Sequence, residues 1–526
     1  MKNLHFLNKT LTGLAFVLAL NSCTDLDEVP LDGIITVAPG GTVNTAAFLQ
    51  TAYNGLRDFQ TQGQTFAMNE MSTDALAGPT RGGDWDDNGD WRQIHTHTWS
   101  PAHVQVRDTW NNVLSNVYNC NQIINNNGTA SEILQARFLR AFFYYHIIDL
   151  YGQAPYRVAG ESLEVDPKVW TRTEGTTFII SELEAIVGSL PARNASDPGI
   201  VNKDAAHFLL AKLYLNKAVF TANTATGPFT FVAADMTKVV QNVDAMTNSI
   251  ESSYWKNFEP NNNTSTELVF TVKNISGSRD NDVRSRWYMS SHYNQRPGGW
   301  NGFTTVAEYY NKFDANDTRI NYSTPTIISE FGNNVGYRVG QQKNAKNRDE
   351  KGRDKDPVTL VPYTNIVGGT LNLQDRKGNP LIFTSALTLV VGGATVETAG
   401  IRGMKYIPDA TNFDKPENDY VLFRYSDALL MKAEAILRGG SGTAPNMTTY
   451  FARTGQPAIT LDLVNIYAER GRELWWEGWR RNDMIRFGKF LDLRGLKPYV
   501  SATKYVLYPI PADALLNPNM KQNPGY

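Results

Sequence analysis

Apolar residues recur every three or four positions over most of the first half of the chain. In residues 202–219, for example, the apolar stripe falls on Ala206, Leu209 and Leu210, and Asn202 is placed to cap the first turn. The stripes come in pairs separated by short polar breaks, which is the pattern of helical hairpins. No repeat of fixed period is present, so any helical solenoid is degenerate. The periodicity predicts helices over residues 46–58, 107–126, 131–151, 174–190, 202–219, 232–247, 423–438 and 460–490.

The pattern changes in the later part of the chain. Short β-like runs such as 267–272, 381–384 and 386–391 are separated by Gly, Asn and Pro. Residues 341–357 are almost all polar or charged, and they predict a mobile surface excursion. The expected fold class is mainly α, with an irregular, loop-rich lobe that contains short β-strands. We expect the helical scaffold at residues 40–250 and 420–490, and the irregular lobe at about 60–105 and 255–420.

The first residues of the chain carry a targeting pattern. Lys2 and Lys9 make a positive start, residues 11–20 form an apolar run too short to span a bilayer, and Cys23 follows small residues. This order is typical of a bacterial lipoprotein, so we expect residues 1–22 to be a signal peptide and Cys23 to carry lipid. An ordinary signal peptide that ends near a cysteine is the alternative. Several acyl chains would anchor the protein without a spanning helix.

Charge and cysteine content further limit the class of protein to which the chain can belong. The formal net charge of −2 becomes −4 when Lys2 and Lys9 leave with the signal peptide, so nucleic acid is not an expected partner. With Cys23 acylated, Cys120 is the remaining cysteine and no intrachain disulfide can form. Cys120 lies in an apolar helical stripe and is expected to be buried. Residues 23–526 are long enough for one large domain.

A glycine- and aspartate-rich loop at residues 80–93 resembles the first half of a calcium loop. Its core, DWDDNG at residues 84–89, has oxygen-bearing side chains at the first, third and fifth positions and Gly at the sixth. The twelfth position, which needs a bidentate Glu, is His95. Residues 92–99 alternate like a strand rather than continuing as a helix. The loop is therefore not an EF-hand, although adventitious calcium binding stays open.

The same loop has the side chains that a sugar requires. Trp85 and Trp91 offer flat faces to the C–H face of a sugar ring, and Arg81, Asp86 and Asn88 can bind its hydroxyl groups. We expect at least one of the two tryptophans to pack inward instead. The loop is thus a candidate ligand-binding surface.

Two enzyme-like patterns have structural explanations. Glu473 and Glu477, four positions apart, could form a glycosidase pair on one helical face, but arginines throughout residues 470–486 favour an ion-pair network. The three histidines within residues 95–103 could suggest zinc, yet packing explains them as well and no cysteine accompanies them. No nucleophile-elbow, phosphate-loop or dinucleotide motif is present. We expect a binding protein, with no catalytic residues, no metal centre and no cofactor.

Six motifs in order along the chain carry a resemblance to a known family. They are Ala52-YNGLR, Gln135-ARFLRAFFYYHIIDLYGQAPY, Lys203-DAAHFLLAKLYLN, Phe423-RYSDALLMKAEA, Glu473-LWWEGWRRNDMIRFGKF, and the terminal pair Tyr508-PIP and Asn523-PGY. From Cys23 to Tyr526 the chain resembles the SusD/RagB family of lipid-anchored nutrient-binding proteins of Bacteroidetes outer membranes. The resemblance implies a degenerate tetratricopeptide-like helical scaffold and an irregular lobe that carries the ligand face.

The resemblance also indicates where the ligand would bind. In a starch-binding member of the family, an arc of aromatic residues bends around the glycan. The corresponding loop here is roughly 78–92, the matching Tyr falls near Tyr288, and the matching Trp falls on Trp300. Trp287 could replace Tyr288 by a slip of one residue. Trp300 follows Gly-Gly, which leaves room for a ligand plane, and a packed Trp that fixes a turn is the alternative.

The function that the resemblance implies is the capture of oligosaccharides at the surface of the outer membrane for a SusC-like TonB-dependent transporter. Expected partners are that transporter, a glycan, and the membrane through the lipid anchor. The alternative is a peptide-capturing lid of a RagB-like peptide importer. A purely structural lid is a third possibility, and it predicts that Trp85, Trp91, Tyr288 and Trp300 do not converge on one surface.

Overall fold

The structure, a computed structural model, describes residues 41, 43–158, 161–162, 164–277, 282–392 and 396–526. Within it, Thr45–Tyr526 form one compact unit. The predicted signal peptide and the lipidated Cys23 lie outside the described residues. Among the residues that are described, no helix is both long enough and apolar enough to cross a membrane.

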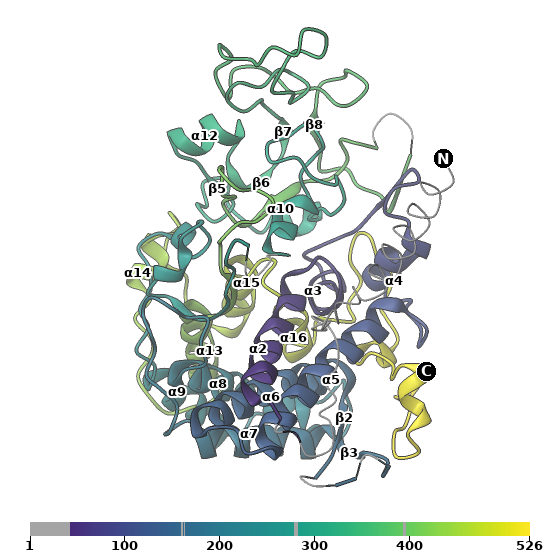
Figure 1. The fold of residues 1–526 in the computed structure, drawn as a ribbon, viewed down its shortest axis with the longest axis vertical. Coiled ribbons are helices and arrows are strands. Elements are labelled where there is room, and N and C mark those ends of the chain that lie inside the picture. Colours follow the sequence, from purple (N-terminus) through teal and green to yellow (C-terminus); the bar gives the residue numbers. More distant parts are fainter. Residues whose placement is uncertain (1–40, 42, 159–160, 163, 278–281, 393–395) are drawn as a thin grey trace, which may run out of the picture. The chain divides into compact units, whose positions relative to one another are not determined.

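Helices that follow one another in the chain pack side by side. They are α5 (Val104–Asn125), α6 (Ala130–Tyr151), α7 (Arg172–Ile186), α8 (Lys203–Phe220) and α9 (Ala233–Asp244) (Figure 1). Each contacts the next member of the series, as in a row of helical hairpins. The predicted mainly helical scaffold is therefore confirmed.

Local signals fix where these helices begin and end. Thr129 and Glu132 form a capping box at the start of α6, and Gly152, with φ 74°, ends it in the left-handed conformation. Asn202 caps α8 as predicted, because its side chain accepts a hydrogen bond from the backbone N–H of Ala205 at 3.0 Å. Cys120 is fully buried in α5, also as predicted.

Helices from the two ends of the chain complete the scaffold. These are α2 (Thr45–Gly55), which packs on α5 and α6, α13 (Tyr425–Leu437), which packs on α8 and α9, and then α15 (Leu463–Glu473) and α16 (Arg480–Arg486). The expected helix over 460–490 is thus two helices. The break is built around Trp476 and Gly478, whose φ angles of 57° and 84° are incompatible with a right-handed helix.

Among the short helices that were not expected are α3 (Gln64–Glu70) and α4 (Asp90–Thr96). The prediction that residues 92–99 alternate as a strand is wrong, because Trp91, Ile94 and His95 are buried together, at the spacing of one helical face. Polar positions between these buried residues imitate the alternation of a strand.

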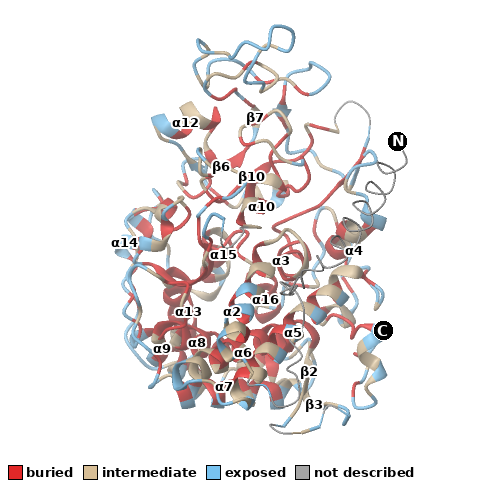
Figure 2. Ribbon diagram, in the orientation of Figure 1, coloured by how far each residue is buried: buried red, intermediate tan, exposed pale blue. Residues whose placement is uncertain are grey.

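The irregular lobe is held together by short pairs of strands. Antiparallel β4 (Leu268–Val272) and β11 (Tyr420–Arg424) lie against the scaffold, and β6 (Val335–Arg338) lies between β5 (Asn321–Tyr322) and β10 (Arg402–Met404). Farther out, β7 (Gly340–Gln341) pairs with β8 (Ile382–Phe383). Figure 2 shows the buried residues gathered among the helices and the outermost loops exposed.

One strand pair ties the candidate loop to this lobe. Strand β1 (Thr80–Arg81) pairs in parallel with β9 (Val390–Val391). The β-like run 386–391 is a strand only at β9, so its expected length was wrong. The pairing joins the loop after residue 80 to a segment about three hundred positions later in the sequence.

Candidate ligand-binding site

Trp85, Tyr288 and Trp300 lie next to one another at the surface. The ring centroids of Trp85 and Trp300 are 6.4 Å apart, and those of Tyr288 and Trp300 are 5.5 Å apart. Trp300 is 37% exposed, and the other two rings are half-buried. We call these three residues the aromatic platform. The structural-lid hypothesis, which predicts that such residues are scattered, does not agree with this arrangement.

The backbone before Trp300 folds back on α10 (Ser285–Tyr288), and this turn positions two of the rings. The N–H of Trp300 donates to the carbonyl oxygen of Tyr288 at 2.7 Å. A Cβ atom on Gly299 would lie 2.6 Å from the carbonyl oxygens of both Tyr288 and Ser291. Glycine is therefore required at 299 by the close approach of the main chain.

Trp85 reaches the same surface through an unusual local conformation. Its φ angle is 61°, and its indole N–H donates to the carbonyl oxygen of Trp300 at 2.9 Å. The ring lies against Gly302, where a Cβ would approach it to 2.3 Å, and against Phe303 at 4.9 Å between centroids. These contacts fix the orientation of Trp85 before any ligand arrives.

Arg81 lies beneath the platform rather than on it. The residue is 3% exposed, and its guanidinium donates to the carbonyl oxygens of Gly302, Val396 and Ala399 at 2.8–3.2 Å. Burial lowers the pKa of Arg81 to about 9. Because its donors are used by main-chain carbonyls, Arg81 fastens the loop to the lobe and does not present hydrogen bonds to a ligand.

Two of the candidate tryptophans face the interior. Trp91 is 6% exposed, packs on Phe303 at 5.0 Å, and donates from its indole N–H to Asp87 at 2.6 Å. One of the two loop tryptophans therefore packs inward, as predicted. Trp287 has no exposed surface, so Tyr288, and not its neighbour, contributes the ring at this position.

The polar candidates Asp86 and Asn88 lie at the exposed edge of the loop. Asp86 pairs with Arg92 at 2.7 Å. Asn88 has a φ angle of 53°, and its carbonyl oxygen accepts a hydrogen bond from the side chain of Gln93 at 3.1 Å. Both side chains are open to solvent beside the platform, and both also shape the loop.

Two acidic residues that were not among the predicted sugar-binding residues lie at the platform. The hydroxyl group of Tyr288 donates to Asp414 at 2.5 Å, and partial burial together with this carboxylate raises the pKa of Tyr288 to about 12. Asp84 accepts a hydrogen bond from the hydroxyl group of Tyr293 at 3.3 Å. No local motif marks Asp414, because the loop that holds it is 126 residues away from Tyr288.

The three histidines of residues 95–103 make hydrogen bonds that serve the fold. His95 and His97 bind the carbonyl oxygens of Leu76 and Ser72, and burial lowers the pKa of His95 to about 3. His103 binds the carbonyl oxygen of Asp90 at 3.2 Å. In the part of the chain that the structure describes, no group of three or more His, Cys, Asp or Glu residues is arranged to hold a metal ion.

Glu473 and Glu477 are both buried and ion-paired. Arg319, Arg424 and Arg453 contact the carboxylate of Glu473, and Arg424 also contacts Glu477 at 2.6 Å. Burial alone would raise the pKa of Glu473, but the three guanidinium groups hold it well below its usual range. An ion-pair network is present, as the sequence predicted.

The partners in this network differ from the expected ones. Since α15 ends at Glu473, the two carboxylates do not share a helical face. The nearby arginines instead pair with carboxylates elsewhere: Arg470 with Asp427 and Asp483, Arg472 with Glu469, Arg480 with Asp74, Arg481 with Asp149, and Arg486 with Glu434 and Asp483.

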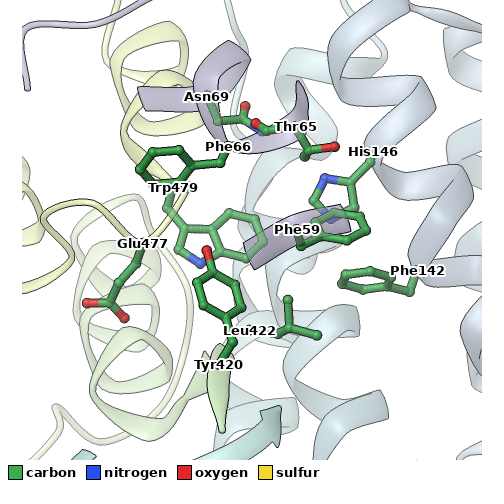
Figure 3. Close-up of a pocket in the computed structure, with 11 residues that line it drawn as sticks. Phe59, Thr65, Phe66, Asn69, Phe142, His146, Tyr420, Leu422, Glu477 and Trp479 are labelled. Carbon is green, nitrogen blue, oxygen red and sulfur yellow. The ribbon is translucent and has the colours of Figure 1, made fainter. Parts of the chain in front are cut away.

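Glu477 also borders a small interior void of about 20 Å³, which has room for roughly one water molecule. Aromatic side chains that include Phe66, Phe142 and Trp479 enclose it (Figure 3). A sugar cannot enter this space. A larger hollow of about 470 Å³ lies between Arg172 and Lys504, and the three platform residues do not line it.

The chain is therefore mainly helical, and its irregular lobe has a cluster of three aromatic rings at the surface. Residues 266–526 match the model of the SusD family. The starch-binding protein SusD of Bacteroides thetaiotaomicron is 26% identical, over 88% of this chain and 85% of its own. A SusD-like protein of Formosa agariphila is 25% identical, over 98% of this chain and 99% of its own.

Solved structures share the fold of this chain. A SusD superfamily protein of Parabacteroides distasonis superposes with a TM-score of 0.65 at 19% identity, covering 92% of this chain and 98% of its own. Surface glycan-binding protein A of Bacteroides thetaiotaomicron, solved with laminarihexaose, gives a TM-score of 0.61 at 19% identity, covering 91% and 98%. Residues 266–526 thus match the SusD family, and the starch-binding relative aligns with most of the chain, which confirms the resemblance that the motifs indicated.

Proposed function

We propose that this protein captures an oligosaccharide on the aromatic platform and delivers it for import. The observation that carries the proposal is the convergence of Trp85, Tyr288 and Trp300 at one exposed surface. Aromatic faces stack on the C–H faces of sugar rings, and exposed carboxylate and amide groups beside them accept hydrogen bonds from sugar hydroxyls.

The expected affinity is modest. Each aromatic contact contributes about 0.5–1.5 kcal/mol beyond the area that it buries, so three contacts suit a dissociation constant between micromolar and millimolar. Weak binding fits a protein that must release its cargo. The rigid contacts of Trp85 support this function, because a ring that is already fixed loses little freedom when the ligand binds.

The relatives support a glycan over a peptide. One is named as a starch-binding protein, another as a laminarin-binding SusD-like protein, and a third was solved with laminarihexaose. None of these names a peptide ligand, so we do not favour the peptide-capturing lid of a RagB-like importer. We also propose that the protein binds without catalysis, since the paired carboxylates of Glu473 and Glu477 are buried away from the platform.

The cellular setting is part of the same proposal. The protein would be anchored by lipid on Cys23 at the surface of the outer membrane, and a SusC-like TonB-dependent transporter would receive the glycan. The targeting pattern at residues 1–23 and the match of residues 266–526 to the SusD family support this setting.

A polysaccharide retardation gel tests the binding function. The protein from residue 24 onward is run through gels that contain starch, laminarin or other neutral glycans, beside the Trp300→Ala variant. Tyr118→Ala is a matched control, because Tyr118 is an aromatic residue of α5 with the same 37% exposure as Trp300. Retardation that Trp300→Ala abolishes and Tyr118→Ala preserves is expected. Free migration through every glycan gel would contradict the proposal.

A further inference from the structure

The two ends of the aromatic platform carry exposed carboxylates. Asp84 immediately precedes Trp85, and its carboxylate accepts a hydrogen bond from the hydroxyl group of Tyr293 at 3.3 Å. At the other end, Asp414 accepts from the hydroxyl group of Tyr288 at 2.5 Å, and its side chain is 75% exposed. Carboxylates in water are ionised at neutral pH, so each end of the platform presents a negatively charged acceptor.

Three arginines near the platform have acidic partners. Arg92 pairs with Asp86 at 2.7 Å, Arg284 lies 3.6 Å from Asp414, and Arg376 pairs with Glu397. An anionic ligand that approaches one of these guanidinium groups therefore meets the carboxylate already paired with it.

The cations beneath the platform are not accessible either. Arg81 and Arg402 are 3% and 1% exposed, and both donate to main-chain carbonyls, including that of Gly302. A ligand that lies on the rings cannot form hydrogen bonds with them. The exposed carboxylates of Asp84 and Asp414 are acceptors, which suit the hydroxyl donors of a sugar.

We propose that the platform selects neutral, hydroxyl-rich glycans and rejects glycans that carry carboxylate or sulfate groups. This inference rests on the proposed function and names the class of glycan. A hydroxyl that donates to Asp84 or Asp414 gains a charge-assisted hydrogen bond, whereas an anionic substituent at the same place meets a like charge. Specificity thus comes from repulsion at the ends, and affinity comes from the rings between them.

The experiment uses one polymer in two charge states. Laminarin and laminarin oxidised to the carboxylate at C6 share a backbone, as do starch and its C6-carboxylated form, and each pair is titrated against the protein by calorimetry at low and moderate salt. The double variant Asp84→Asn/Asp414→Asn removes both charges and keeps the side-chain shape. Asp513→Asn, an exposed site on the C-terminal segment, is the matched control.

The neutral form is expected to bind at least tenfold more tightly than the carboxylated form. The double variant is expected to reduce that ratio about tenfold, and Asp513→Asn to leave it unchanged. Equal or tighter binding of the carboxylated form by the unaltered protein would overturn this inference and leave the proposed function standing, as would an unchanged ratio in the double variant. Binding of neither form of either polymer would contradict both.

Discussion

The indole N–H of Trp85 donates to the carbonyl oxygen of Trp300 at 2.9 Å, across 215 positions of sequence. This hydrogen bond links the loop after β1 to the turn after α10. It makes the orientation of one platform residue depend on the backbone of another. The platform is therefore a property of two segments held together, and substitutions that never touch a ligand can disrupt it.

Substitution of Gly302 tests that dependence. In Gly302→Ala the new Cβ would lie 2.3 Å from the Trp85 ring, so the ring must move and one stacking surface is lost. We expect glycan affinity to fall about tenfold, which corresponds to about 1.4 kcal/mol. Titration calorimetry measures the change. Gly83→Ala is the control, because a Cβ at 83 meets nothing within 4 Å, and equal affinity of the two variants would contradict the account.

The buried position of Arg81 predicts a loss of stability as well as of binding. Arg81→Met removes the donors of three main-chain carbonyls, and each acceptor left unsatisfied costs about 1–3 kcal/mol, partly offset by removal of a buried charge. We expect the free energy of unfolding to fall by about 2–4 kcal/mol. Arg92→Met, at an exposed ion pair, should cost less than about 1 kcal/mol. Denaturant unfolding measures the stability of the two variants. An Arg81→Met variant that is fully stable but cannot bind glycan would contradict this prediction and indicate that Arg81 contacts the ligand directly.

The ion-pair network of Glu473 predicts that substitution of this residue lowers the stability of the fold. Glu473→Gln leaves three buried guanidinium groups short of a negative charge, and breaking a buried pair in this way costs about 3–5 kcal/mol. Thermal unfolding of the variant should show a marked fall in Tm, while Glu164→Gln at an exposed position should not. Full stability of Glu473→Gln would mean that the network is not needed for the fold.

Glu70 predicts a pH dependence of stability. Burial raises its pKa from 4.5 to about 8, despite the hydrogen bond that it accepts from the N–H of Gly478. Because the folded state holds this proton more tightly than the unfolded state, the stabilisation is complete below pH 4.5 and is lost as pH rises toward 8. The loss is on the order of 4 kcal/mol over that interval.

Glu70→Gln imitates the protonated side chain and removes the titration. Between pH 5 and 8 the free energy of unfolding of the unaltered protein should fall more steeply than that of the variant, as measured by urea unfolding across the pH series. Parallel curves for the two proteins would contradict the assignment. Lys405, whose pKa burial lowers to about 7, acts in the opposite sense and is present in both proteins.

Local patterns predicted the paired helices well, because Asn202 and the apolar stripe of α8 act within a few residues of each other. They failed at α4, where the buried residues Trp91, Ile94 and His95 are separated by polar positions that also fit a strand. The spacing of three and four was present in the sequence and could have indicated a short helix.

The residues of the candidate site also differ in how far the sequence could predict them. Trp300 and Tyr288 could be placed through the resemblance of their segments to a known family. The burial of Arg81 and Trp287 depends on contacts with residues far away in the sequence, so residue type alone gave them the wrong environment. No sequence pattern indicated Asp414, because its place beside the platform depends on a hydrogen bond with Tyr288, 126 positions away in the sequence.

The most direct test of the central claim is a crystal structure of the protein with a bound neutral hexasaccharide, such as laminarihexaose or maltohexaose. We expect a sugar ring stacked on Trp300, with Trp85 and Tyr288 in contact with neighbouring rings and hydroxyl groups directed to Asp84 or Asp414. A glycan bound elsewhere, for example in the hollow between Arg172 and Lys504, with the platform unoccupied, would contradict it.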